Sequence, residues 1–155
     1  MQNTISNQIL HRSDLQSDHI ALRHQGQCLS YAELGQRVHY YAAALRQLNL
    51  NPGEHIALHA DKGIDSVCVL LASILCKLTV VPLNPLLKPA QMQHILIDAG
   101  ITVLISNQAG LQHIQACLAH CTSLKQVILS DDMVQTRPLL ANQELLTWDD
   151  LSSSI

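Results

Sequence analysis

The sequence is poor in aromatic side chains and in charge, and both shortages narrow the range of functions. It contains no phenylalanine, and aromatic residues make up 3% of its 155 residues. Charged residues make up 14%, the net charge is -3, and lysine and arginine are scattered without a basic run. Proteins that bind nucleic acids or acidic membranes usually carry a basic patch. The sequence therefore predicts no nucleic-acid partner.

Long uninterrupted hydrophobic runs are also lacking. The most apolar stretch, 64–83, contains Asp65, Lys77 and Pro82, and its longest uncharged part is about half of the ~20 residues that a membrane span needs. A buried core helix is the favoured interpretation. The first thirty residues are polar and have no apolar core of a signal peptide. We therefore expect a cytoplasmic protein without a membrane span.

The cysteines lack the spacing of a disulfide or zinc framework. There are five, an odd number, and no Cys-x-x-Cys pair occurs. Three of them lie in apolar helix patterns, so buried free thiols in a reducing compartment are the better interpretation. The five are Cys28, Cys68, Cys76, Cys117 and Cys121.

What the sequence does contain is an alternation of short apolar runs and helix patterns. The run 56–60 is followed by a long apolar helix pattern and then by the run 79–83, which is a strand, a crossover helix and a strand. The alternation continues to Leu129. It predicts an α/β fold, an open and mostly parallel sheet with helices on both faces. An apolar content of 48% in 155 residues suffices for one substantial core.

A small β-hairpin is predicted before the sheet, from 20–24 and 27–29 around Gln25-Gly26. Ser30 and Glu33 then form a capping box, with Leu29 and Leu34 placed as its hydrophobic staple. Apolar residues at steps of three and four follow on one helix face. They are Leu34, Val38, Tyr41, Leu45 and Leu48.

Both ends of the chain lack such patterns. Residues 1–18 are interpreted as a polar lead-in with a short surface helix and a loop. Residues 130–155 are expected to form an irregular tail with one apolar patch at 145–151. Within this tail, the acidic pairs at 131–132 and 149–150 are expected to be solvated loop residues.

A phosphate-binding loop requires clustered glycines at a helix N-terminus, and the six glycines of this chain are isolated. The segment 60–63 lies between a strand and a helix, where an anion could bind. A plain turn with Asp61 or Asp65 near the helix N-terminus is the favoured alternative.

His113, Cys117, His120 and Cys121 lie in one helical stripe and are zinc-ligand types. Four ligands on a single helix approach an ion from one side, so a core role is favoured. Cys68 and Cys76 are expected in the core, and His55 and His59 beside solvent or a hydrogen-bond partner. No histidine stands in a recognisable motif with a thiol or serine, and no carboxylate pair is placed for acid–base catalysis.

The order of four segments resembles the beginning of the adenylate-forming (AMP-binding) acyl-CoA synthetase superfamily. These are Leu-Ser-Tyr-Ala-Glu-Leu at 29–34, Asn-Pro-Gly-Glu-His-Ile-Ala-Leu at 51–58, Leu-Leu-Ala-Ser-Ile-Leu at 70–75 and Val-Val-Pro-Leu-Asn-Pro at 80–85. The segments 81–89 and 94–98 are particularly similar to the exosortase A-associated acyl-CoA ligases. The resemblance runs from about Ile20 to Leu151. Lys77 and Leu78 stand where the family usually has small residues including glycine.

The resemblance implies a two-step reaction in which a carboxylate and ATP form an acyl-adenylate and coenzyme A then displaces AMP. It also implies that 1–155 are a single partial domain, the first part of a large α/β domain. The family's phosphate loop, nucleotide contacts, magnesium-binding glutamate and catalytic lysine lie further along than Ile155. No catalytic, cofactor-binding or metal-binding residue can therefore be assigned here. ATP, magnesium and coenzyme A are expected only for the full-length family.

The leading hypothesis is thus an N-terminal fragment of an acyl-CoA ligase that is inactive alone. Its partner would be the remainder of the ligase chain, or a homo-oligomer that covers exposed apolar surface. The alternative is a free-standing α/β binding or interaction module derived from such an enzyme. A small metal- or thiol-dependent enzyme built on the Cys117 helix is the weakest hypothesis.

Overall fold

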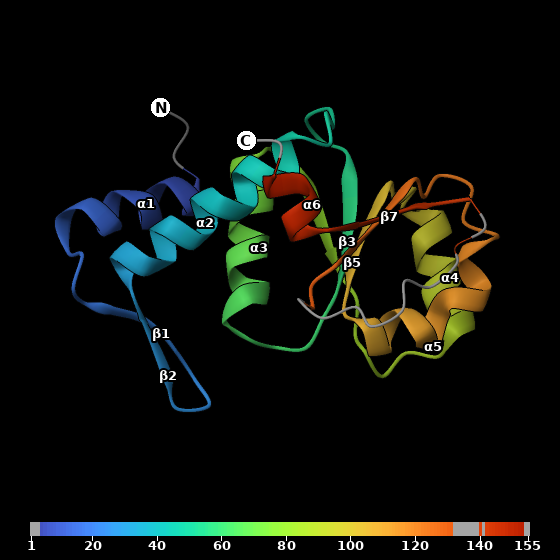
Figure 1. Ribbon diagram of the computed structural model, residues 1–155, viewed down its shortest axis with the longest axis horizontal. Coiled ribbons are helices and arrows are strands. Elements are labelled where there is room, and N and C mark those ends of the chain that lie inside the picture. The colour runs from blue at the N-terminus through green and yellow to red at the C-terminus, as the bar shows by residue number, and fades with distance from the viewer. Residues whose placement is uncertain (1–3, 132–139, 141, 154–155) are drawn as a thin grey trace.

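The structure of the protein is a computed structural model that describes residues 4–131, 140 and 142–153. Its centre is a sheet of five parallel strands in the order β4-β3-β5-β6-β7 (Figure 1). Helices cover both faces, so the predicted fold class is confirmed. The strands are β3 (His55–His59), β4 (Thr79–Pro82), β5 (Val103–Ser106), β6 (Gln126–Leu129) and β7 (Glu144–Thr147).

The predicted hairpin precedes the sheet. Strand β1 (Ile20–His24) pairs antiparallel with β2 (Gln27–Ser30). Gln25 and Gly26 connect them with φ angles of 46° and 82°. Positive φ at both central residues is what a two-residue hairpin turn of the favoured hand requires.

Helix α2 (Tyr31–Arg46) begins with the predicted capping box. The backbone N–H of Ser30 donates to Glu33 Oε2 (2.8 Å), and the N–H of Glu33 donates to Ser30 Oγ (3.2 Å). Leu29 and Leu34 are both buried in the same hydrophobic cluster. Local sequence therefore fixes where this helix starts.

Alternate residues of the strands supply two separate cores. Ile56 and Leu58 of β3 belong to a cluster with α2 and α3 (Ile64–Leu75). Ala57 belongs to a second cluster with α4 (Pro89–Asp98) and α5 (Gln108–Leu118) on the opposite face. Because both faces are covered, the strands are apolar at almost every position.

The end of α3 explains how Lys77 occupies a position where glycine was expected. Lys77 has a φ of 61°, and the N–H of Leu78 donates to Ser73 O at 3.0 Å. This is the left-handed helix ending that glycine usually makes. A residue with a side chain adopts it at a cost of about 1 kcal/mol.

The helix in the polar lead-in, residues 1–18, packs against the rest of the protein more closely than was expected for a surface helix. Helix α1 (Ile5–Leu15) contacts both α2 and α3, and Ser6 is buried with its hydroxyl donating to Leu71 O at 2.9 Å. Gly35 allows the close approach, since a Cβ there would lie 3.0 Å from Ser13 Oγ. Ile9 and Leu10 of α1 also pack against the apolar core, whereas Ser6 and Gly35 carry no hydrophobic signal in the sequence.

The expectation of an irregular tail over 130–155 is wrong where the structure describes it. Strand β7 pairs in register with β6, and α6 (Trp148–Ser152) follows it. Asp149 and Asp150 therefore lie in a helix, and Asp150 caps its first turn through the N–H and hydroxyl of Thr147. Asp132 lies outside the described residues. The strand was missed because its four residues show no clear alternation.

In the part of the chain that the structure describes, no helix is both long and apolar enough to cross a membrane. The longest apolar helix, α3, instead packs against α2 and β4. This agrees with the interpretation of that stretch as a core helix.

Candidate functional site

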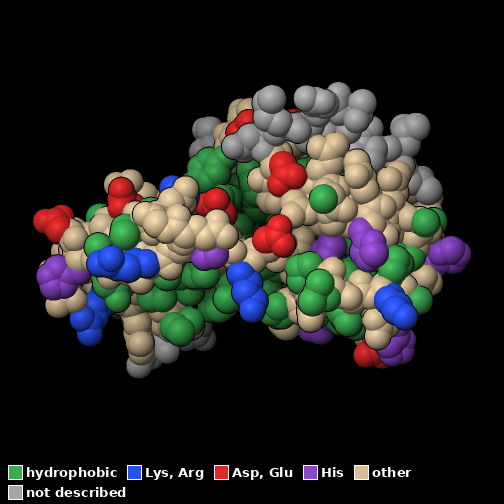
Figure 2. Space-filling model, turned by 90° about the horizontal axis from the view of Figure 1, so that it is seen from below, with side chains coloured by type: hydrophobic (Ala, Val, Ile, Leu, Met, Phe, Trp, Pro, Cys, Tyr) green, Lys and Arg blue, Asp and Glu red, His purple; other side chains and the backbone are tan. Residues whose placement is uncertain are grey.

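The sheet has a topological switch point between β3 and β5. The chain leaves β3 toward α3 on one face and leaves β5 toward α5 on the other, so the carboxyl ends of these strands border a crevice. Open α/β sheets bind ligands at such crevices. Figure 2 views this end of the sheet and shows histidine and acidic side chains gathered between hydrophobic areas.

His59, the last residue of β3, forms the floor of this crevice. It is only 2% exposed, and its Nδ1 lies 3.1 Å from the Oγ of Ser106, the last residue of β5. The two residues are register partners in the parallel ladder. Burial lowers the pKa of His59, and the nearby His113 lowers it further, while Asp61 acts in the opposite direction. The imidazole is therefore held in its neutral form at neutral pH.

Gly110, in the first turn of α5, lets the helix approach the imidazole. A Cβ at this position would lie 2.7 Å from His59 Cε1 and 2.7 Å from Ser106 Oγ. Such distances are too short for any side chain without a shift of the surrounding atoms. Helix α5 can therefore pack directly against His59 because Gly110 has no side chain.

Asn107 links the two strand ends. Its Oδ1 accepts a hydrogen bond from the N–H of Gly110 (2.7 Å), and its Nδ2 donates to Asp61 Oδ2 (3.3 Å). Asp131, which follows β6, accepts from the N–H of Gln108 at 2.8 Å. The polar groups of three strand ends are thus joined around the N-terminus of α5.

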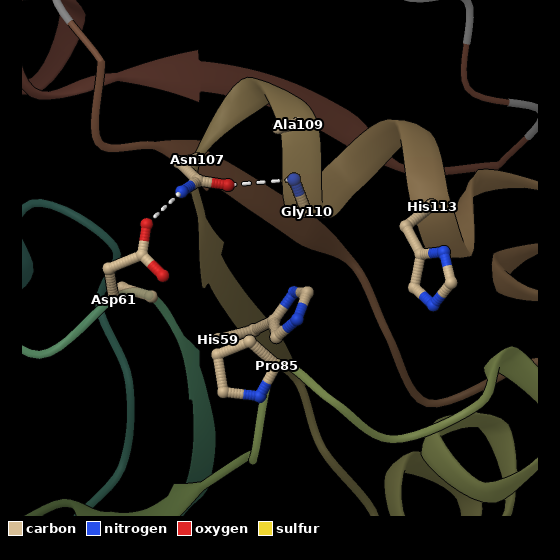
Figure 3. A pocket seen from close by; sticks show the side chains of 8 residues that line it. His59, Asp61, Pro85, Asn107, Ala109, Gly110 and His113 are labelled. Carbon is tan, nitrogen blue, oxygen red and sulfur yellow. Dashed lines mark hydrogen bonds between the residues drawn. The ribbon is translucent and has the colours of Figure 1, made fainter.

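A pocket of about 240 Å³ opens above His59 (Figure 3). The ring of His59 lies between Pro85 and the first turn of α5, with His113 across the pocket. Among the described residues, neither lysine nor arginine lines it. The arrangement offers hydrogen-bond acceptors in a partly enclosed space.

The candidate anion site at 60–63 has the geometry of the plain turn that was the favoured alternative. Gly63 precedes α3, and its N–H donates to Ser66 Oγ at 3.0 Å. Asp65 lies in the first helical turn and forms an ion pair of 2.8 Å with Arg37. A carboxylate therefore already occupies the position near the helix N-terminus that an anion would take.

The structure does not bring the four zinc-type residues of α5 together. Cys117 and Cys121 are buried, and their thiols donate to Ile114 O (2.9 Å) and Cys117 O (3.6 Å). His113 and His120 are exposed. Among the described residues, no group of three or more His, Cys, Asp or Glu side chains could hold a metal ion. Core packing explains the two cysteines of the stripe, whereas the two histidines lie on the surface.

The remaining thiols and His55 show no catalytic arrangement. The cysteines are free, and burial raises the pKa of Cys68 to about 11 and also raises that of Cys76. A thiol with a raised pKa is a poor nucleophile. His55 Nδ1 lies 2.6 Å from Ala99 O, so the side chain has the partner that was expected.

Comparison with known proteins identifies the family. The family described as "AMP-binding enzyme" matches residues 10–153. This is nearly the whole chain, so the protein belongs to the AMP-binding enzyme family. The expected resemblance is confirmed at this level, whereas the exosortase A-associated subtype stays a prediction.

Curated relatives and a solved structure agree with this assignment. The chain is 33% identical to feruloyl-CoA synthase of Amycolatopsis sp over 99 residues, 64% of this chain and 20% of that protein. It is 30% identical to surfactin synthase subunit 1 of Bacillus subtilis (strain 168) over 91 residues, 59% of this chain and 2% of that protein. Coronafacic acid ligase from Pectobacterium brasiliense superposes with a TM-score of 0.83 at 16% identity, over 96% of this chain and 29% of that chain. The last comparison shows the shared fold.

The chain thus spans a fifth or less of the length of these two curated relatives. It matches the N-terminal region of AMP-binding acyl-CoA ligases.

The cluster around His59 was not predicted from the sequence. His59 was expected to face solvent or a partner, and Ser106 and Gly110 were not singled out. A usable signal does exist, because each of two buried apolar strands ends in a polar residue at the switch point. Recognising it requires the strand order, which the sequence does not show.

Proposed function

We propose that this chain is the N-terminal part of an ATP-dependent acyl-CoA ligase. The whole enzyme would join a carboxylic acid to coenzyme A by way of an acyl-adenylate, with release of AMP and pyrophosphate. ATP, magnesium and coenzyme A would be bound by the whole enzyme. A cytoplasmic location fits substrates of this kind.

One observation carries the proposal: the family match over 10–153 coexists with a coverage of only 20% of feruloyl-CoA synthase. A chain that matches the family along nearly all of its length and covers a fifth of a related enzyme is best explained as one part of such an enzyme. The segments 81–89 and 94–98 favour the exosortase A-associated subtype within the family.

We expect the magnesium–nucleotide site of the whole enzyme to be formed by other segments. Two observations support this expectation: among the described residues no group of three or more side chains could hold a metal, and the six glycines of the sequence stand singly. Phosphoryl chemistry depends on positioned donors and metal ions. We therefore expect no adenylation by the 155-residue chain alone, and its role would be to form part of the scaffold beside the catalytic segments.

An apolar groove supports the expectation that something covers this part. A groove of about 790 Å³ lies between α3 and the segment after β4, lined mainly by apolar atoms. Leu86 at its rim is 90% exposed. Exposed apolar surface of this kind is commonly buried by another domain or subunit. The remainder of the ligase chain is the proposed partner, and a second copy of the chain is the alternative.

The test begins with the intact mass of the native product and the reading frame downstream of Ile155. A product several times larger than 17.1 kDa that forms acyl-CoA from ATP, coenzyme A and a carboxylic acid is the expected result. ATP–pyrophosphate exchange should be present in that product and absent from the 155-residue chain. A native product of 17.1 kDa would contradict the proposal.

The same groove would also serve a free-standing interaction module, the second candidate function. Sedimentation velocity of the 155-residue chain separates the two. A stable homodimer that Leu86→Asp converts to a monomer would favour the module. A soluble monomer with the groove open to solvent would favour a scaffold that lacks its remainder.

A further inference from the structure

The hydrogen bonds around His59 favour one of the two neutral tautomers of its ring. The hydroxyl of Ser106 donates to Asn107 O at 3.2 Å. Its oxygen is then the acceptor for the ring, and the Nδ1–H of His59 donates to it at 3.1 Å. A neutral imidazole carries one proton, so Nε2 has a free lone pair.

The free nitrogen faces the pocket. The Nδ1–Cε1 edge of the ring is covered by Ser106 and by Gly110, whose position leaves no room for a Cβ beside Cε1. The opposite edge, which contains Nε2, lines the pocket shown in Figure 3. Nε2 has no hydrogen-bond partner among residues 4–131, 140 and 142–153. The His59 side chain as a whole is nevertheless buried, with 2% of its surface exposed.

Asp61 adds a negative charge to the same pocket. One of its carboxylate oxygens accepts from Asn107 Nδ2, and the other is left for a ligand. Two nearby donors already have partners, since one hydrogen of Asn107 Nδ2 goes to Asp61 and His113 Nε2 lies 3.3 Å from Leu87 O. The pocket therefore presents acceptors and a carboxylate.

We propose that the pocket above His59 binds a primary ammonium group on a short alkyl chain. The ammonium group would donate to Nε2 of His59 and to the free carboxylate oxygen of Asp61. The alkyl part would lie against Pro85, Ala60 and Ala109, which supply the apolar walls. This proposal does not rest on the ligase assignment.

Other ligands fit the pocket less well. An anion would meet Asp61, and the pocket's described lining provides no lysine or arginine to balance it. A transition-metal ion needs three or more ligands in most protein sites, and the described residues provide no such group. An ammonium group needs only acceptors, which are present.

The test uses the ¹⁵N-labelled 155-residue chain and the side-chain nitrogen resonances of His59. In the free protein, the Nδ1–H tautomer is expected. Ethylammonium chloride should then shift the Nε2 resonance in a saturable manner. Tetramethylammonium chloride, a cation without N–H donors, and sodium phosphate should leave it unchanged.

Two matched variants locate the binding. Asp61→Asn, at an exposed position, should weaken ethylammonium binding about tenfold through loss of a charge-assisted hydrogen bond. Asp98→Asn, at an exposed position on α4, should leave it unchanged. An Nε2–H tautomer, a shift without saturation, an equal response to tetramethylammonium, or equal effects of the two variants would each overturn the proposal.

Discussion

The two faces of the sheet differ at the carboxyl ends of the same two strands. On the α2–α3 side, Leu58 and Ile105 are register partners and both are buried in an apolar core. On the α4–α5 side, the next pair is His59 and Ser106, which are equally buried but polar. A polar pair has to satisfy its hydrogen bonds inside the protein, whereas the apolar pair needs only to pack. On the α5 side of the switch point, the buried polar pair therefore contributes less to the stability of the fold than an apolar pair would.

The largest expected contrast is between neighbouring residues of β5 that face opposite sides. Ile105→Ala should lower the free energy of unfolding by about 2–5 kcal/mol, because it leaves a cavity in the apolar core. Ser106→Ala should cost less, about 1–3 kcal/mol, because it leaves the buried Nδ1 of His59 without its hydrogen-bond partner. Urea unfolding followed by circular dichroism measures both. Equal losses would break the distinction between the two faces.

Gly110→Ala should have the next largest effect. The added Cβ would approach His59 Cε1 and Ser106 Oγ at 2.7 Å, so α5 has to move away at a cost of about 1–3 kcal/mol. Gly63→Ala, at the start of α3, is the control, because a Cβ there meets nothing within 4 Å. It should cost less than about 1 kcal/mol. A Gly110→Ala protein as stable as this control would show that α5 is not held against His59.

The pH dependence of stability tests the burial of His59. The pKa of His59 is lowered in the folded state, so below pH 6.5 the unfolded chain takes up a proton first. The contribution of His59 to the free energy of unfolding is therefore fully present above pH 6.5. It is lost as the pH falls toward the lowered pKa of the folded state. The slope is at most one proton, about 1.4 kcal/mol per pH unit.

His59→Gln should flatten this acid slope, while His120→Gln, at an exposed position, should preserve it. Urea midpoints measured between neutral and mildly acidic pH provide the comparison. An unchanged slope in His59→Gln would mean that other groups cause the loss of stability in acid.

The sequence predicted the elements with strong local signals. The capping box at Ser30, the turn at Gln25-Gly26 and the alternation from 56 to 129 each correspond to the structure because short-range physics decides them. The parallel sheet follows from that alternation. Strand β7 was missed because its pairing with β6 decides it. The docking of α1 was missed because its few apolar residues, Ile9 and Leu10, are joined in the contact by the buried polar Ser6.

The candidate site could not be predicted from the sequence for a related reason. His59 and Ser106 are 47 residues apart, and only the order β4-β3-β5 makes them neighbours. Residue spacing drew attention instead to the stripe of histidine and cysteine on α5, where helical periodicity alone creates the pattern. Local sequence motifs therefore predicted where helices begin, but they did not predict the candidate site.

The smallest expected effect concerns how helices end on the two sides. Helix α4 is followed by Gly100 at a φ of 58°, whereas α3 is followed by Lys77 at 61°. Lys77→Gly should relieve the left-handed strain and raise the free energy of unfolding by about 0.5–1 kcal/mol, or roughly 1–4 °C in melting temperature. Asn49→Gly, at a φ of 51°, should gain less, because asparagine tolerates this conformation. A loss of stability in Lys77→Gly would instead mean that the lysine side chain contributes more through its contacts than its backbone strain costs.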